Sequence, residues 1–358
     1  MTLTITPAAD ARAWDAFLAE QRFRPFLQSW TMGDVYADIG QEPIRLEARC
    51  DDAMLGICFG HVVPARRGKH IAVPYGPVIA AHAPAETAQR LLDALASEAK
   101  RRGCTFVRYS PFQQEGATPS AGRPSPLHLL AEHLWYLPLQ NPDPWSGGAE
   151  GIACSEEELL ANMRKTTRNL IRRAERDGIT VEASPDPVAD LPEFIRLHDE
   201  TRKRHGFTPY TNAFFRAQVA RFAPRGECSL YLARFQGQVI AAAMHMHAFG
   251  ETSYHHGASS SAHAKLPASY LLQWTAIRDA LRRGDRVYSF WGIAPVTPDA
   301  EGTLRPTNPR HPFSGVTLFK TGFGGALLNL EHCRDLPLAP SYAITRTIET
   351  IRKWRRGF

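Results

Sequence analysis

The chain has 358 residues, of which 44% are hydrophobic, and a formal net charge of +6. This composition is typical of a globular protein and excludes a largely disordered one, and the length favours about two domains. The basic balance is compatible with an anionic partner but does not require one.

Six cysteines are spread along the chain, and no two have C-x-x-C spacing. The pattern indicates neither a zinc site nor a redox dithiol, and is typical of small buried thiols in a reducing cytoplasm. The first residues, Met1 to Pro7, lack the basic and apolar regions of a signal peptide. No apolar run is long enough to predict a membrane-spanning helix, although basic side chains could still contact a membrane surface.

The first half of the chain predicts alternating strands and helices. Apolar spacing and the cap residue Ser29 indicate two early helices, and the turn Asp51-Asp52 indicates a β-hairpin. The predicted elements are a strand at 3–5, helices at 11–18 and 30–36, strands at 44–48, 53–63 and 71–78, a helix at 85–101, a strand at 104–109, a short helix at 128–136, and a strand from 135 to 139.

Residues 141–153 are rich in proline and glycine and predict a linker, after which a similar order of elements begins again. The predicted elements are helices at 155–177, 191–204 and 211–222, strands at 180–183, 229–234 and 239–248, a strand-helix-strand unit at 254–293, and a helix at 341–358 with a basic end. The economical interpretation is two copies of one α/β unit. We expect domains at 1–145 plus 331–358 and at 146–330.

The strand-helix-strand unit at 254–293 has Tyr, His and Trp at its strand ends. Ligands of open sheets bind where strands end, whereas aromatic residues in strands are also common packing residues. His245 and His247 share one face of a predicted strand, but no cysteine or acidic cluster with ligand spacing accompanies them, so we expect no metal. His256 is better suited to be a hydrogen-bonding group or a base.

Arg164, Arg168 and Arg172 recur every four residues and would share one face of the predicted helix at 155–177. Such a ridge suits the phosphates of a nucleotide, a lipid pyrophosphate or RNA. A solvated face partly neutralised by Glu175 and Asp177 is the alternative interpretation.

A second basic stretch includes Arg204 and leads into a loop that ends at Tyr210. Arginine and tyrosine there could hold a carboxylate or a phosphate. Basic residues that complement a helix C-terminus explain the same pattern.

Residues 316–325 predict a strand that runs into a glycine-rich turn and carries Lys320. A lysine in this position suits an anion or a developing oxyanion. The segment is not a P-loop, because the lysine precedes the glycines, and no G-x-S-x-G motif is present.

Taken in order, several segments resemble the FemABX family, the aminoacyl-tRNA-dependent peptidyltransferases that build peptidoglycan cross-bridges. The segments are 26–30, 75–78, 165–175, 254–259, 270–274, 291–293 and 319–325, of which 165–175 is the most specific. The resemblance implies an α/β fold with mixed sheets and two GNAT-like domains in tandem. It also implies the short form of the family, without an inserted coiled-coil arm.

The resemblance implies transfer of an amino acid from aminoacyl-tRNA to an amine of a muropeptide precursor, nucleotide- or lipid-linked, without metal or cofactor. It implies a monomer in the cytoplasm or at the inner face of the membrane. By the same resemblance, Lys320 and Phe319 are catalytic residues at the aminoacyl ester. Tyr254 and His256 line the acceptor channel, and Arg204 and Tyr210 hold the acceptor.

The sequence departs from the family on the acceptor side. Asp34 or Tyr36 stands where relatives carry a lysine, and His256 replaces a frequent tyrosine. A non-wall peptide acceptor therefore stays open. A GNAT-type acyl-CoA N-acyltransferase is a second hypothesis, against which the absence of a Q/R-x-x-G-x-G/A pyrophosphate loop counts. A non-catalytic binding protein is a third.

Overall fold

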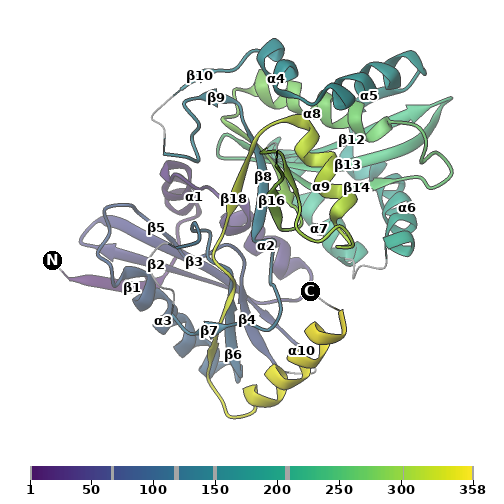
Figure 1. Cartoon of the computed structure of the whole chain (residues 1–358). Coiled ribbons are helices and arrows are strands. Elements are labelled where there is room, and N and C mark those ends of the chain that lie inside the picture. Colours follow the sequence, from purple (N-terminus) through teal and green to yellow (C-terminus); the bar gives the residue numbers. More distant parts are fainter. Residues whose placement is uncertain are drawn as a thin grey trace. The chain divides into compact units, whose positions relative to one another are not determined.

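The computed structural model describes residues 2–65, 68–116, 121–147, 151–205, 210–300 and 302–356. The chain forms two compact units, Met1–Glu132 with Asn329–Phe358 and His133–Leu328 (Figure 1). Each unit is built around one mixed β-sheet with helices packed against it.

The sheet of the first unit consists of β1 (Leu3–Pro7), β2 (Pro43–Cys50), β3 (Ala53–Val63), β4 (His70–Val73), β5 (Val78–Ile79), β6 (Phe106–Tyr109), β7 (Arg123–Pro124) and β19 (Arg334–Pro337). The strand order is β1-β2-β3-β4-β6-β19-β7, with β5 paired to β3. β4 and β6 are parallel. The hairpin of β2 and β3 confirms the prediction made from its polar turn.

The helices of the first unit are α1 (Ala11–Glu20), η1 (Phe26–Gln28), α2 (Trp30–Asp38), α3 (Thr87–Arg101) and α10 (Tyr342–Arg356). Ser29 caps α2 as predicted, and its side chain accepts a hydrogen bond from the Met32 amide. The apolar face of α3 buries Leu91, Leu95 and Ala99 in the core cluster formed with the sheet.

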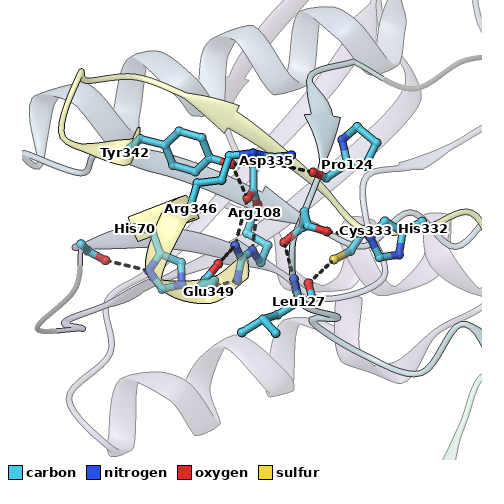
Figure 2. A network of polar contacts seen from close by, with 12 residues as sticks. His70, Arg108, Pro124, Leu127, His332, Cys333, Asp335, Tyr342, Arg346 and Glu349 are labelled. Atoms are coloured by element: carbon cyan, nitrogen blue, oxygen red, sulfur yellow. Dashed lines mark hydrogen bonds and ion pairs between the residues drawn. The ribbon is translucent and has the colours of Figure 1, made fainter. Parts of the chain in front are cut away.

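A buried ion-pair network joins β6, β19 and α10 (Figure 2). The Arg108 guanidinium donates to both carboxylate oxygens of Asp335, at 2.7 and 2.9 Å, and to Glu349 at 2.6 Å. The Tyr342 hydroxyl donates to Asp335 at 2.7 Å. Burial alone would lower the pKa of Arg108, but the two carboxylates raise it. The C-terminal segment is therefore tied into the first unit.

The sheet of the second unit consists of β8 (His133–Pro138), β11 (Thr180–Ala183), β12 (Cys228–Phe235), β13 (Gln238–Ala248), β14 (Glu251–Ser259), β15 (Val287–Gly292) and β18 (Ala326–Asn329). Two short pairs lie beside it, β9 (Gln140–Asn141) with β10 (Ile152–Ala153) and β16 (Val296–Pro298) with β17 (Leu304–Pro306). The strand order is β11-β12-β13-β14-β15-β8-β18, and β14 and β15 are parallel.

The helices of the second unit are α4 (Glu156–Asn162), α5 (Lys165–Arg176), α6 (Pro187–His205), α7 (Asn212–Phe222), η2 (Ala223–Arg225), α8 (Ala268–Arg283), α9 (Ser314–Lys320) and η3 (Thr321–Phe323). The core cluster includes Leu272, Ile277 and Ala280 of α8 together with Phe290 of β15.

The two units repeat one order of elements. β2, β3, β4, α3 and β6 of the first unit correspond to β12, β13, β14, α8 and β15 of the second. In each unit the strand next to the parallel pair comes from outside the repeated segment. β19, near the C-terminal end of the chain, pairs with β6, and β8, which precedes the second repeat, pairs with β15. The repeat predicted from the sequence is therefore present in the structure.

The position of β8 in the second sheet explains why the expected domain boundaries differ from those in the structure. The units divide after Glu132 and after Leu328, rather than after 145 and 330, because β8 pairs with β15 of the second sheet. The predicted short helix at 128–136 is wrong for the same reason, since residues 133–138 are strand.

The predicted helix at 155–177 is interrupted. Ser155 forms the expected capping box with Glu158, but Met163 has an extended backbone and Arg164 is the N-cap of a new helix, α5, that begins at Lys165. The Arg164 amide donates to the Gly322 carbonyl at 2.9 Å. A partner far along the chain therefore fixes the break.

The predicted strand at 316–325 is also wrong, because its first part is α9 and its second part is η3. Thr317 is fully buried. Its hydroxyl donates to the Phe313 carbonyl and accepts from the Ala294 amide, at 2.8 and 2.9 Å. The local bond to Phe313 and the tertiary contact with Ala294 together outweigh the strand preference of a Val-Thr-Leu-Phe sequence.

Candidate active site

The two parallel strands of the second unit separate at one end. β14 and β15 pair at residues 251–253 and 287–289, but β14 continues to Ser259 and β15 continues to Gly292. The strands therefore diverge beyond Ser253 and Ser289. In open sheets, ligands bind in the crevice at the carboxyl ends of parallel strands. This divergence is the geometric basis of the candidate site.

Lys320, the last residue of α9, reaches this divergence and is only 7% exposed. Its Nζ donates to the Gly292 carbonyl at 2.6 Å and lies 5.6 Å from the centre of the Tyr254 ring. The amine thus joins one diverging strand to the other. Among the described residues no other lysine is buried.

Burial lowers the pKa of Lys320 to about 7, because the charged ammonium loses its hydration. An ammonium has three N–H donors, and Gly292 takes one of them, so donors remain for a ligand. A cation in such a water-poor place interacts strongly with developing negative charge.

A β-bulge separates Tyr254 from His256. Opposite residues of paired strands share a face, and Tyr254 pairs with His245 whereas His256 pairs with Met244. Because His245 and Met244 are neighbours on β13, Tyr254 and His256 point to opposite faces of the sheet. The expectation that both line one channel is therefore wrong: Tyr254 lies with Lys320, and His256 lies elsewhere.

The ring of Tyr254 rests on a buried polar chain. It stacks on His245 with ring centres 5.4 Å apart. His245 Nε2 lies 2.8 Å from the Tyr288 hydroxyl, which donates to Gln273 Oε1 at 2.7 Å. Since the Tyr288 proton is directed to Gln273, His245 Nε2 must be the donor to Tyr288. His245 is thus held as a neutral support, in agreement with its pKa, which burial lowers to about 3.

Gly257 makes room for Tyr254. A Cβ at Gly257 would lie 1.8 Å from the Tyr254 hydroxyl oxygen, so any larger residue there would displace the Tyr254 ring from this position. Burial raises the pKa of Tyr254 to about 12, which keeps the phenol neutral and able to donate a hydrogen bond.

On the other face, His256 lies in an aromatic group formed by residues of α6 and α7 and by Tyr210, which precedes α7. Its ring centre is 4.9 Å from that of Phe215, 5.3 Å from Tyr210 and 6.5 Å from Phe194. Its Nε2 is buried without a hydrogen-bond partner among the described residues. Burial first, and His255 and His198 second, hold the pKa of His256 well below its usual range. The structure therefore brings His256 and Tyr210 together.

Arg204 stabilises the end of β14 by hydrogen bonds. Its guanidinium donates to the Ser259 carbonyl at 3.3 Å, to the Ser261 hydroxyl at 2.8 Å and to the Ser259 hydroxyl at 3.1 Å. Thr201 also bonds to Ser259. These contacts position the strand end that carries the histidines, whereas residues 206–209, between Arg204 and Tyr210, lie outside the described residues.

The three arginines expected to form one ridge at 164–172 differ in their contacts. Arg164 donates to the Leu318 carbonyl and to the Thr321 hydroxyl, so it holds α9 and η3. Arg168 donates to the carbonyls of Leu160, Ala161 and Met163 at the end of α4. Only Arg172 of the three is exposed. The prediction of one continuous face is wrong for Arg164, which precedes α5.

The glycines beside Lys320 serve close packing. A Cβ at Gly322 would lie 2.4 Å from the Thr167 hydroxyl, and one at Gly325 would lie 2.2 Å from the Tyr136 carbonyl oxygen. Phe319 packs edge-on against Tyr270, with ring centres 4.9 Å apart. These contacts place the end of α9 against α5, α8 and β8, and thereby position Lys320.

The conformation of Trp291 is a feature of the site that the sequence does not predict. Trp291 has a φ of 67°, a left-handed conformation that is strained for a bulky residue, and its ring lies 5.2 Å from that of His255. Strain of this kind gathers at functional sites. His245 and His247 are buried hydrogen-bonding groups, because His245 bonds to Tyr288 and His247 bonds to Thr252 and Ser229.

The chain resembles known acyltransferases in sequence and in fold. A family model described as an acetyltransferase (GNAT) domain matches residues 161–299. No curated protein sequence matches the chain significantly. The fold is similar to that of FemX, with a TM-score of 0.75 and 16% identity, over 98% of this chain and 100% of that chain.

Two further solved structures are similar over most of their length. A tandem GNAT protein from the clavulanic acid biosynthesis pathway has a TM-score of 0.51 and 12% identity, over 95% of this chain and 99% of that chain. A conserved protein of unknown function from Bacteroides thetaiotaomicron has a TM-score of 0.58 and 11% identity, over 93% of this chain and 99% of that chain. The expected fold of two tandem GNAT-like domains is thereby confirmed, and the similarity to FemX agrees with the resemblance found in the sequence. Together with the GNAT match, it supports an acyltransferase.

None of the helices in the described ranges is both long and apolar enough to cross a membrane.

Proposed function

We propose that this protein transfers an aminoacyl group from aminoacyl-tRNA to an amine of a peptidoglycan-precursor stem peptide. One observation carries the proposal: a buried amine, Lys320, bridges diverging parallel strands in a chain that has the FemX fold along its length. The acceptor is the amine of a nucleotide- or lipid-linked muropeptide, and the protein acts as a monomer on the cytoplasmic side of the membrane.

The reaction balances without a redox partner. The acceptor amine attacks the ester carbonyl, a C–N bond forms, and the carbonyl electrons move to oxygen as an oxyanion. Collapse of this intermediate breaks the C–O bond to the tRNA ribose, and the proton lost by the amine ends on the ribose oxygen. The step that needs help is the one in which negative charge appears on the carbonyl oxygen.

Lys320 is assigned to that charge. Its protonated form has N–H donors beyond the one used by Gly292, and its pKa of about 7 keeps a substantial fraction charged near neutral pH. The face of the Tyr254 ring favours the ammonium by a cation–π contact. Phe319 positions the lysine through its packing on Tyr270.

The acceptor side is assigned to the opposite face of the sheet, from which the acceptor amine would reach the ester at Lys320 between the diverging ends of β14 and β15. His256 and Tyr210 offer an imidazole acceptor and a phenol there, within an otherwise aromatic group. Arg204 supports this site from the end of β14. The exposed Arg172, with Lys165 and Arg176 on the same helix, supplies the positive charge expected of a tRNA contact.

The alternative donor is an acyl-CoA, which the GNAT match favours. The segment between β14 and α8, residues 260–267, contains no glycine, and Pro267 precedes α8 without a side-chain cap. A glycine-rich turn that cradles a pyrophosphate is therefore missing from this connection, which favours the aminoacyl-tRNA donor.

Mass spectrometry of cell-wall precursors tests the proposal in cells with and without the gene. We expect precursors in the parent to carry an added amino acid that disappears when the gene is deleted and returns with the parent protein but not with the Lys320→Met variant. Identical precursors in all strains would contradict a wall acceptor.

A further inference from the structure

The C-terminal helix α10 turns an apolar face outward. Ile344, Ile348 and Ile351 recur at helical spacing and are 66%, 36% and 48% exposed, and Trp354 in the next turn is 83% exposed. Residues three and four apart lie side by side on a helix. The four side chains, here called the α10 face, therefore form one continuous apolar strip.

The polar side of the same helix is held against the first unit. Glu349 bonds to the buried Arg108, Tyr342 bonds to Asp335, and Arg346 donates to the Pro124 carbonyl at 2.8 Å (Figure 2). Tyr342 and Thr345 are each 3% exposed. The helix cannot turn its apolar side inward without breaking this network, so the outward face is a fixed feature of the fold.

Positive charge accompanies the α10 face. Arg352, Lys353 and Arg355 lie in its last turns, and Arg355 falls between Ile348 and Ile351 in the helical projection. Cations at a helix C-terminus are common for electrostatic reasons alone, but those reasons do not explain exposed isoleucines. Aliphatic residues with a terminal tryptophan and flanking cations are the composition of helices that lie in a membrane interface.

We propose that the α10 face binds the surface of an anionic lipid bilayer, with the isoleucines and Trp354 among the acyl chains and the cations at the headgroups. RNA fits this face less well, because isoleucine offers neither stacking nor hydrogen bonds to bases. A second copy of the chain would bring another cationic helix to the same face. This inference does not rest on the proposed reaction, since it concerns binding without substrate.

Sedimentation with phospholipid vesicles tests the inference. The full chain is mixed with vesicles of phosphatidylglycerol and phosphatidylcholine, or of phosphatidylcholine alone, and the bound fraction is measured. We expect binding to the anionic vesicles that weakens by roughly tenfold or more in the double variant Ile348→Glu and Ile351→Glu. Neutralising Lys353→Gln and Arg355→Gln together is expected to weaken it by a similar factor.

The matched control is the double variant Ile152→Glu and Val188→Glu. These residues are 83% and 56% exposed on other elements, so the change in charge is the same and more exposed apolar surface is lost, and vesicle binding should still equal that of the parent. Thermal unfolding of each variant reports whether its fold is retained. Absence of vesicle binding by the parent would overturn the inference, and so would a loss in the control double variant equal to that in the Ile348→Glu and Ile351→Glu variant. If vesicles are not bound, two other results would show a different occupant of the α10 face. One is a parent dimer that the Ile348→Glu and Ile351→Glu variant dissociates, and the other is tRNA binding that the same variant abolishes.

Discussion

Replacement of Lys320 by methionine separates the chemical role of the amine from its role in packing. Methionine is also unbranched and fills similar space, so the packing of α9 should persist. The lowered pKa of Lys320, from 10.5 to about 7, corresponds to about 5 kcal/mol of preference for the neutral amine. Burying the charged amine is thus unfavourable, and its removal relieves that cost. Loss of the donor to Gly292 costs about 1–3 kcal/mol, which is less than the burial cost that is relieved, so we expect the unfolding free energy at neutral pH to rise by roughly 2–4 kcal/mol.

The effect on transfer should be much larger. Removal of one donor to an oxyanion typically costs about 100- to 1,000-fold in kcat, or about 3–4 kcal/mol. The assay is transfer of radiolabelled amino acid from charged tRNA to a muramyl pentapeptide, with urea unfolding measured on the same preparations. Lys100→Met, on the exposed side of α3, is the matched control and should keep full activity. A folded Lys320→Met protein within about threefold of the parent would refute the assignment.

Three further predictions follow from the geometry of the two units. Because charged Lys320 is the active form, the transfer rate should fall as pH rises through about 7. Between pH 7 and 10.5 the unfolded chain binds a proton at Lys320 that the folded chain lacks, so the unfolding free energy should rise with pH. This rise should disappear in Lys320→Met. A parent unfolding free energy that does not change with pH would contradict the prediction. Gly257→Ala should displace the Tyr254 ring and lower the transfer rate by about tenfold or more. Gly315→Ala is the control and should have no such effect, because no atom lies within 4 Å of the added Cβ. Equal transfer rates in the two variants would contradict the role given to Tyr254. Asp335→Asn should lower the urea unfolding free energy by about 3–5 kcal/mol, since it leaves Arg108 partly unpaired in a buried site. Glu193→Gln, in an exposed pair with Arg196, should lower it by less than about 1 kcal/mol. Similar losses in the two variants would show that the network does not hold the C-terminal segment.

Local patterns predicted much of the fold. The polar turn at Asp51-Asp52 and the cap at Ser29 each determine a neighbouring element. The strand-helix-strand unit at 254–293 was predicted because its periodicity changes from two to that of a helix and back. It contains β14, α8 and β15 as expected.

What could not be predicted depends on partners far away in the sequence. The break at Arg164 and the helix at Lys320 hold each other through contacts between residues 164 and 318–322, and no local pattern reveals such a pair. The bulge between Met244 and His245 moves His256 away from Tyr254, yet leaves no mark in the sequence of β14. For this reason the structure groups the predicted site residues differently from what the sequence indicates.

The central claim is that an aminoacyl ester, and not an acyl thioester, is the donor at Lys320. The purified protein is incubated with a muramyl pentapeptide and either total tRNA charged with radiolabelled amino acids or radiolabelled acetyl-CoA, and the peptide product is identified by mass spectrometry. We predict one added aminoacyl residue from the tRNA arm, which is abolished by prior ribonuclease treatment and strongly reduced in Lys320→Met. Transfer from acetyl-CoA alone, with none from charged tRNA, would contradict the account.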